Sequence, residues 1–183
     1  MNRQADLAFL GRALSPLDAE TVSALRDDLG GGTLAWESVI DLASRHLVTP
    51  VLWRGLADKG LLDDLPAEVR SYLEAVHELN GERNRRIADQ LLEIATVLNR
   101  AGLEPVLLKG VAYLCDDLYG DPAARVIGDV DLLVASNQLA AAVGALAAIG
   151  YREIGLDDFS FATHHHHTPL ARAHEVAAVE LHT

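Results

Sequence analysis

The stretch from Leu107 to Val134 constrains the fold of this chain more than any other feature. The apolar segment Pro105 to Lys109 predicts a short strand, and Gly110 directly after it opens a helix through VAYLCDDLY. The turn-rich loop GDPAARVIG then leads to a second predicted strand, Asp129 to Ala135. A strand, a helix and a second strand in this order predict a small α/β arrangement built around a sheet.

The first hundred residues have the pattern of helices. Ser15-Pro16 predicts the start of one helix, Thr33 the cap of a second, and Pro50 the start of a third. A long helix is predicted from about Pro66 to Arg100. Its apolar residues keep the spacing of three and four that marks one buried stripe: Val69, Leu73, Val76, Leu79, Ile87, Leu91, Ile94 and Leu98.

After the second strand, a helix over QLAAAVGALAAIG is predicted, capped by Ser136 or Asn137 and ended by Gly150. Three further segments are candidate strands: Tyr151 to Gly155, Phe159 to His167, and Ala177 to His182. We therefore expect an α+β protein, with a helical region at 1–100 that packs on a mixed-sheet core at 101–183 flanked by helices.

The composition excludes several classes of protein. Asp and Glu number 27 against 15 Lys and Arg, a formal net charge of −12, so a broad basic surface for nucleic acid is not expected. No apolar run reaches the roughly 20 residues that span a bilayer. Cys115 is the single cysteine, so no intrachain disulfide can form, and we expect a reducing cytoplasm. Within its predicted helix, Cys115 is expected to be a small core residue.

The two carboxylates of Asp129-Val-Asp131 begin the second strand. Because side chains alternate along a strand, both carboxylates lie on one face, while Val130 and Leu132 turn to the other. Two Asp side chains about 7 Å apart repel each other unless a cation lies between them. Magnesium ions coordinated through oxygen suit this arrangement and suit phosphoryl or nucleotidyl transfer. The alternative is a pair of strand-end acids in water, which D-x-D alone would favour.

Positive charge and a glycine accompany this pair. Lys109 and Gly110 occupy a strand-to-helix turn, where backbone N–H groups approach a phosphate and the lysine adds a full charge. Arg125, in the loop before Asp129, is a second candidate for holding phosphates. The alternatives are an ordinary strand-end lysine and a loop arginine that pairs with Asp121 or Asp129.

A third carboxylate on a neighbouring strand would complete such a site or activate the attacking hydroxyl. Glu180 is the candidate, and His182 shares its face of the predicted strand. The alternative is an exposed edge strand.

A separate charged turn, GERNRR, interrupts the long helix. It is either a solvated turn or the source of an arginine (Arg83, Arg85 or Arg86) over a phosphate cleft.

A run of four histidines, His164 to His167, lies inside the chain. It is interpreted as an exposed polar edge strand, as part of an acceptor site or general base near the metal (His165, His167 and His182), or as a structural zinc site. Zinc would need three or four ligands, and His174 and His182 are available for that purpose.

Several motifs between Arg83 and His182 together form a specific pattern. They are LLKGVAYL at 107–114, LYGDPAAR at 118–125, GDVDLLV at 128–134, GY at 150–151 and ELH at 180–182. In these motifs the chain resembles the uncharacterised nucleotidyltransferase family, which belongs to the DNA polymerase β-like nucleotidyltransferase superfamily.

The resemblance implies a two-metal nucleotidyltransferase fold. In it Asp129 and Asp131 match the paired metal ligands, Glu180 the third acidic position, and Gly110 the glycine of the nucleotide-binding turn. Many superfamily members carry Gly-Ser at that turn, whereas Lys109-Gly110-Val111 has no hydroxyl, as in this family's own pattern. Family members usually continue beyond ELH, so a C-terminally truncated fragment, a minimal form, and dependence on a partner or a homo-oligomer are the alternatives.

The leading hypothesis is an enzyme that transfers a nucleoside monophosphate from an NTP, with ATP expected, to a hydroxyl of a small molecule, peptide or protein. The expected cofactor is Mg²⁺ or Mn²⁺, held by Asp129, Asp131 and Glu180, while Lys109, Gly110 and Arg125 hold the phosphates. One alternative is a toxin-like nucleotidyltransferase that acts on tRNA, which the acidic charge disfavours. The other is a binding or scaffold module that has kept the fold without turnover. Neither a nucleic-acid partner nor a membrane is expected.

Overall fold

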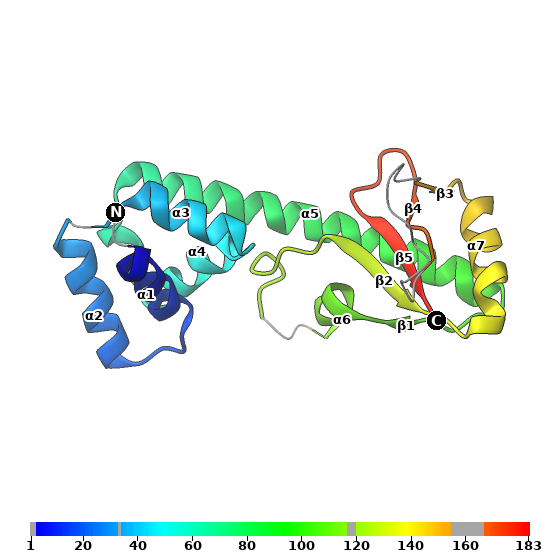
Figure 1. Ribbon diagram of the computed structural model, residues 1–183, viewed down its shortest axis with the longest axis horizontal. Helices are drawn as coiled ribbons and strands as arrows, with labels where there is room; N and C mark the ends of the chain where they lie inside the picture. The colour runs from blue at the N-terminus through cyan, green and yellow to red at the C-terminus, as the bar shows by residue number, and fades with distance from the viewer. Residues whose placement is uncertain (1–2, 33, 117–119, 155–166) are drawn as a thin grey trace. The chain divides into compact units, whose positions relative to one another are not determined.

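The computed structural model describes residues 3–32, 34–116, 120–154 and 167–183. The chain forms two compact units (Figure 1). Met1–Glu82 and Asp121–Val126 form a helical unit, and Arg83–Gly120 and Ile127–Thr183 form a unit that carries the sheet. One long helix, α5 (Ala67–Arg100), contributes residues to both units. Among the described residues, no helix combines the length and the low polarity that crossing a membrane would need.

The helical unit contains short helices and the first part of α5. These elements are α1 (Arg3–Leu14), α2 (Ala19–Gly30), α3 (Trp36–Arg45), α4 (Thr49–Asp58) and the 3-10 turn η1 (Leu62–Asp64). Helix α1 lies within the region predicted to be helical, but no motif of the sequence gives its bounds. Helix α2 begins later than Ser15-Pro16 suggested, because Asp18 is its N-cap and accepts a hydrogen bond from the Thr21 N–H at 2.8 Å. Pro50 lies in the first turn of α4, as predicted, whereas Thr33 lies outside the described residues.

The loop that precedes the second predicted strand belongs partly to the helical unit. Oδ2 of Asp121 lies 2.8 Å from Nε2 of His77, and Oδ1 of Asp121 accepts the backbone N–H of Ala123. Arg54 forms an ion pair with the same carboxylate at 3.5 Å. These contacts tie residues 121–126 to α4 and α5, because each buried polar group of the loop needs a partner.

Helix α5 confirms the predicted long helix and corrects its buried stripe. Leu79 was expected to be buried, and it is 70% exposed. The next residue, Asn80, is buried instead and donates from Nδ2 to the carbonyl oxygens of Ala123 at 2.7 Å and Arg125 at 2.9 Å. Buried backbone carbonyls require donors. The helix therefore presents an amide here, where the apolar pattern predicted a leucine.

The sheet unit carries the remaining elements. They are β1 (Val106–Leu107), α6 (Lys109–Cys115), β2 (Asp129–Leu133), the 3-10 turn η2 (Ser136–Gln138), α7 (Leu139–Ala148), β3 (Arg152–Glu153), β4 (Leu170–Ala171) and β5 (Ala178–His182). The sheet order is β1-β2-β5-β4-β3. Among the strands that the structure describes, the β2–β5 pair is parallel and the other pairs are antiparallel, so the sheet is mixed. The α+β class predicted from the sequence is confirmed.

One face of the sheet is buried. Val130, Leu132 and Val134 pack with Val179 and Leu181 into a single apolar core. Helices cover this core with apolar residues from α5 and α7: Ile87, Leu91, Ile94, Leu98, Ala142 and Leu146. The burial explains why β2 and β5 hold a fixed register, since a slip by one residue would turn every apolar side chain outward.

Cys115 and the strand β4 differ from what the sequence predicts. Cys115 lies at the end of α6 and is exposed, so the prediction of a core position was wrong. The strand β4 was not predicted, since it has two residues and no clear alternation. Of the candidate strand Phe159 to His167, residues 159–166 lie outside the described residues, and His167 precedes β4.

Candidate functional site

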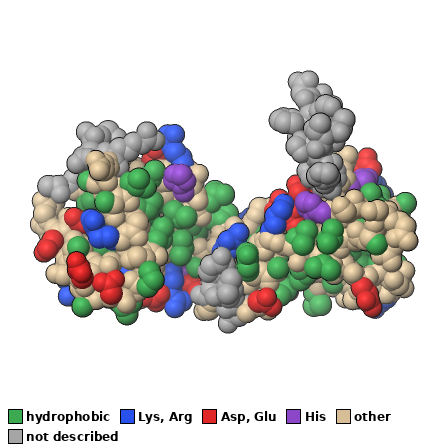
Figure 2. Space-filling view, turned by 60° about the horizontal axis from the view of Figure 1, so that its bottom comes forward, with side chains coloured by type: hydrophobic (Ala, Val, Ile, Leu, Met, Phe, Trp, Pro, Cys, Tyr) green, Lys and Arg blue, Asp and Glu red, His purple; other side chains and the backbone are tan. Residues whose placement is uncertain are grey.

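The parallel strands β2 and β5 bring the predicted carboxylates together. In their register Asp131 is paired with Glu180, and Leu133 is paired with His182. Asp129, Asp131, Glu180 and His182 alternate with the core residues, so they share the face of the sheet opposite the core. Figure 2 shows acidic, basic and histidine side chains next to one another on the surface of the sheet unit.

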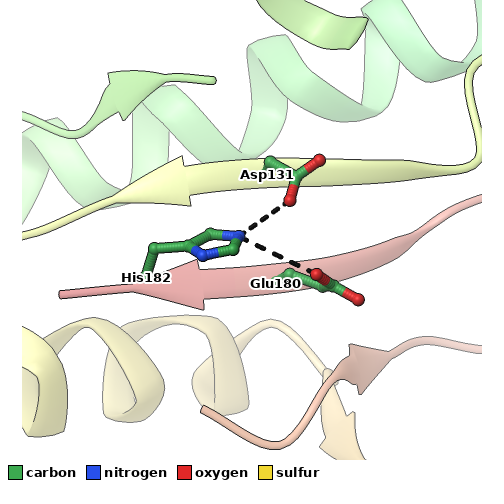
Figure 3. A group of neighbouring side chains, drawn as sticks. All are labelled: Asp131, Glu180 and His182. Atoms are coloured by element: carbon green, nitrogen blue, oxygen red, sulfur yellow. Dashed lines mark hydrogen bonds and ion pairs between the residues drawn. The ribbon is translucent and has the colours of Figure 1, made fainter. Parts of the chain in front are cut away.

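Three of these side chains converge (Figure 3). Nε2 of His182 lies 2.7 Å from Oδ1 of Asp131 and 3.8 Å from Oε2 of Glu180. Asp131 projects from β2, whereas Glu180 and His182 project from β5. Asp131 is 0% exposed, while Glu180 and His182 are half-buried. A buried carboxylate therefore faces two partly accessible ligand-type side chains.

Lys109 supplies positive charge to this group. Its Nζ lies 2.5 Å from Oδ1 of Asp131 and 4.0 Å from Oε2 of Glu180. The lysine follows β1, whose neighbour in the sheet is β2, and its backbone has a φ of +50°. A positive φ is uncommon for a residue other than glycine and indicates local strain. The chain thus adopts an unfavourable backbone angle at the residue whose side chain reaches the carboxylates.

The two aspartates of β2 have different electrostatic environments. Burial raises the pKa of Asp129, and the negative charges of Asp131 and Glu180 raise it further. Burial also acts to raise the pKa of Asp131, but the hydrogen bonds from Lys109 and His182 outweigh it and hold that pKa below its usual value. The hydrogen bond to Asp131 raises the pKa of Lys109. The charged form is therefore stabilised at Asp131 and disfavoured at Asp129.

A divalent metal ion fits these residues. Oδ2 of Asp131 is buried and accepts no hydrogen bond from any residue that the structure describes, and leaving a buried acceptor without a partner is costly. Ligand atoms of Asp131, Glu180 and His182 all lie within 4.8 Å of one another. Ligands bound at about 2.0–2.2 Å on different sides of one ion have separations in this range. Asp129 is not one of these three residues.

Arginines of α5 position the two strands, a role that neither interpretation of GERNRR included. Arg83 donates from Nη1 to the carbonyl oxygen of Ile127, and from Nη2 to those of Gly128 at 3.3 Å and Val176 at 3.1 Å. Ile127 and Gly128 directly precede β2, and Val176 lies two residues before β5. One half-buried guanidinium thus fixes the starts of both strands that carry the site. Arg86 donates to the carbonyl oxygen of His174 at 3.0 Å, and Arg85 is exposed.

Gln90, which no pattern had singled out, holds β5 in the same way. Its Nε2 donates to the carbonyl oxygen of Ala177 at 2.8 Å and to the hydroxyl of Tyr151 at 2.9 Å. Gln90 is buried and lies among the apolar residues of α5. The available signal was a polar residue at a position of the helix that the apolar spacing predicts to be buried.

The other predicted nucleotide-binding residues have different surroundings. Gly110 is buried within α6, and a Cβ at this position would lie 3.2 Å from Cγ2 of Ile127. Close packing against the start of β2 therefore accounts for the glycine, and its contact with a phosphate stays a prediction. Arg125 belongs to the helical unit, where its carbonyl oxygen accepts from Asn80. Its role with phosphates also stays a prediction.

The predicted acceptor-site histidines separate. His182 joins the carboxylates, whereas Nε2 of His167 lies 3.4 Å from Oε1 of Glu153, and its Nδ1 lies 2.8 Å from the carbonyl oxygen of Thr168. His165 lies outside the described residues. His174 is exposed and has a φ of +70°. Among the described histidines, His182 is the one that belongs to the group of potential metal ligands.

Comparison with known proteins gives a family match. The model of a family described as an uncharacterised nucleotidyltransferase matches residues 33–183, which is most of the chain and includes every side chain of the β2–β5 site. No curated protein and no solved structure shows a significant match. The match agrees with the resemblance that the motifs from LLKG to ELH carry.

Proposed function

Because the chain belongs to the uncharacterised nucleotidyltransferase family, we propose that it transfers a nucleoside monophosphate from an NTP to a hydroxyl in a metal-dependent reaction. ATP is the expected donor, and a small molecule, peptide or protein is the expected acceptor. The hydroxyl oxygen bonds to the α-phosphorus, the bond from that phosphorus to its bridging oxygen breaks, and pyrophosphate leaves. The cytoplasm, as the expected location, would supply the nucleotide.

One observation carries the proposal. Asp131 is a fully buried carboxylate whose Oδ2 accepts no hydrogen bond among the described residues, and it faces the carboxylate of Glu180 across a parallel strand pair. A purely structural aspartate at such a position would have its oxygens satisfied by donors. A site that holds a cation leaves one oxygen for the ion.

The residues of the site divide the work of this reaction. Asp131 and Glu180 would hold a divalent cation together with Asp129, and the bound ion would neutralise phosphate charge and polarise the phosphoryl group. The ammonium of Lys109 is near enough to the carboxylates to pair with a phosphate bound beside them. Glu180 is the candidate to accept the proton of the attacking hydroxyl, because it is half-buried and is the carboxylate of the β5 strand. Gly110 and Arg125 keep the phosphate-binding roles predicted from the sequence.

Binding and transfer test the proposal. An ATP analogue with a methylene group between its α- and β-phosphates is titrated by calorimetry with Mg²⁺ or Mn²⁺, and transfer is followed with ATP labelled in the α-phosphate. We expect metal-dependent binding that is lost in Asp131→Asn and weakened in Asp129→Asn. Asp89→Asn, which changes an exposed aspartate of the same unit, is the matched control and should bind as the wild type does.

The outcomes separate the three functions. Absence of nucleotide binding with either metal would refute the enzyme and support a scaffold. Binding that survives Asp131→Asn unchanged would show that the carboxylates are bystanders. Transfer of label to tRNA rather than to protein or small molecules would support the toxin-like alternative.

A further inference from the structure

We propose that His182 is a direct nitrogen ligand of the metal ion, and that the site therefore selects a divalent transition-metal ion over Mg²⁺. The inference rests on the proposed function, because it concerns the same site. It assigns to His182 a role different from acceptor binding, and it narrows the class of cofactor.

The fold fixes His182 in the position of a ligand. It lies two residues after Glu180 on β5, so both side chains point to the same face of the sheet. Nε2 is the ring nitrogen nearest the carboxylates, at 2.7 Å from Oδ1 of Asp131 and 3.8 Å from Oε2 of Glu180. Figure 3 shows the ring pointing between the two carboxylates. The side chain of His182 is 16% exposed, so its ring is held within the protein surface.

A hydrogen bond to Asp131 alone leaves part of this arrangement unexplained. Asp131 does not need His182 for neutralisation, because the ammonium of Lys109 already lies 2.5 Å from the same carboxylate oxygen. Two donors converge on Oδ1 while Oδ2 of the same buried carboxylate accepts nothing among the described residues. A cation bound by Asp131, Glu180 and Nε2 of His182 would use that oxygen or replace one of the donors.

The donor set decides which ions bind well. Mg²⁺ prefers six oxygen ligands at about 2.0–2.1 Å and keeps several waters. An imidazole nitrogen favours first-row transition-metal ions over Mg²⁺. Among those ions, a given site binds Co²⁺ and Zn²⁺ more tightly than Mn²⁺. Two carboxylates with one imidazole therefore hold Mn²⁺, Co²⁺ or Zn²⁺ more tightly than Mg²⁺. With carboxylates alone, this preference would be much smaller.

The test uses Mn²⁺ and electron paramagnetic resonance on the full chain. Loss of the free-ion signal measures binding, and electron spin echo modulation detects a ¹⁴N nucleus bonded to the ion. We expect ¹⁴N modulation in the wild type and Mn²⁺ binding at least tenfold tighter than Mg²⁺ binding. In His182→Gln the modulation should disappear and the affinity for Mn²⁺ should fall about tenfold or more, with little change for Mg²⁺.

Two controls exclude the other histidines of the sheet unit, while His46 and His77 belong to the helical unit. His174→Gln changes an exposed histidine of the same unit, and replacement of His164 to His167 by glutamine removes the histidine run. Both variants should keep the modulation and the affinity. The spectra of these two variants do not depend on whether His182→Gln folds. If that substitution unfolds the protein, modulation retained in both variants still leaves His182 as the nitrogen ligand within the sheet unit.

Each result has one meaning. Bound Mn²⁺ without ¹⁴N modulation, or an unchanged affinity in folded His182→Gln, would overturn the inference and leave the proposed function standing. Loss of the modulation in the histidine-run variant would assign the nitrogen to that run and would also overturn it. Absence of binding by Mn²⁺ and Mg²⁺, with and without the ATP analogue, would refute the proposed function itself.

Discussion

The ammonium nitrogen of Lys109 lies 2.5 Å from Oδ1 of Asp131, the buried aspartate at the centre of β2. The lysine side chain is 56% exposed, so it can leave the carboxylate without opening the core. A metal ion that bound Asp131 would therefore be repelled by the ammonium of Lys109 until that side chain moved away. The same charge would be available to a triphosphate once the ion had replaced it.

Replacing Lys109 by Met should have opposite effects on the two ligands. Without the ammonium, Mn²⁺ alone should bind several-fold more tightly, because like charges no longer compete for Asp131. The ATP analogue should bind about tenfold more weakly in the presence of the metal, since a charge-assisted hydrogen bond to a phosphate is lost. Calorimetry on Lys109→Met and Lys109→Arg measures both effects. A parallel weakening of metal and nucleotide binding would show that Lys109 only supports the structure.

Replacing Asp129 by Asn should stabilise the protein in the absence of metal. Burial and the charges of Asp131 and Glu180 raise the pKa of Asp129, so its ionised form is disfavoured in the folded state. The folded state thus holds this proton to a higher pH than the unfolded state, and the resulting cost is complete above the folded pKa. We expect Asp129→Asn to gain about 1 kcal/mol at pH 7.

The pH dependence checks the origin of that gain. Because the cost vanishes once the group is protonated in both states, the advantage of Asp129→Asn should disappear below 3.8, the pKa of an aspartate in the unfolded chain. Urea unfolding with a chelator present, repeated at several pH values, measures the difference. An advantage that persists at low pH would point to packing instead of charge.

Replacing Arg83 by Gln should loosen the site from a distance. The guanidinium donates to the carbonyl oxygens of Ile127, Gly128 and Val176, which lead into β2 and β5. Loss of these charged donors should cost about 1.5–3 kcal/mol in unfolding free energy. Metal affinity should also fall, because the carboxylates of the two strands lose their fixed spacing. Arg100→Gln, an exposed position on the same helix, should change neither quantity. Normal metal affinity in a destabilised Arg83→Gln would limit Arg83 to folding.

The anchor of the 121–126 loop should be sensitive to acid. Burial acts to raise the pKa of Asp121, but the hydrogen bonds from His77 and the Ala123 N–H hold it below its usual value. A depressed folded pKa contributes stability above the unfolded value of 3.8, and that contribution is lost as the pH falls through the folded pKa. Asp121→Asn should therefore cost about 1–3 kcal/mol at pH 7 and much less near pH 2. Thermal melts between pH 2 and pH 7 measure this loss of stability. A cost that does not depend on pH would show that the negative charge of Asp121 is not its cause.

Local patterns identified the elements that matter most. The alternation from Val130 to Val134 predicted β2 and placed both aspartates on one face, because strand geometry has a period of two. The apolar spacing from Val69 to Leu98 predicted α5 to within one residue at its start. The polar residues Asn80 and Gln90 interrupted that spacing and were missed. The apolar spacing predicts a buried position at Gln90, but the carbonyl groups that Asn80 and Gln90 bind belong to segments far along the chain, which no local pattern contains.

The sequence by itself determined the α+β class, the family, and the residue types available for chemistry: Asp129, Asp131, Glu180 and His182 on short strands, with Lys109 at the end of another. Only the tertiary structure decided that Glu180 pairs with Asp131 and that His182, and not His167, lies next to the carboxylates. Periodicity fixes the face of a strand, but the partner and register of a parallel strand are fixed by long-range packing. In this protein that packing is the core under β2 and β5, together with the donors that Arg83 and Gln90 supply at their ends.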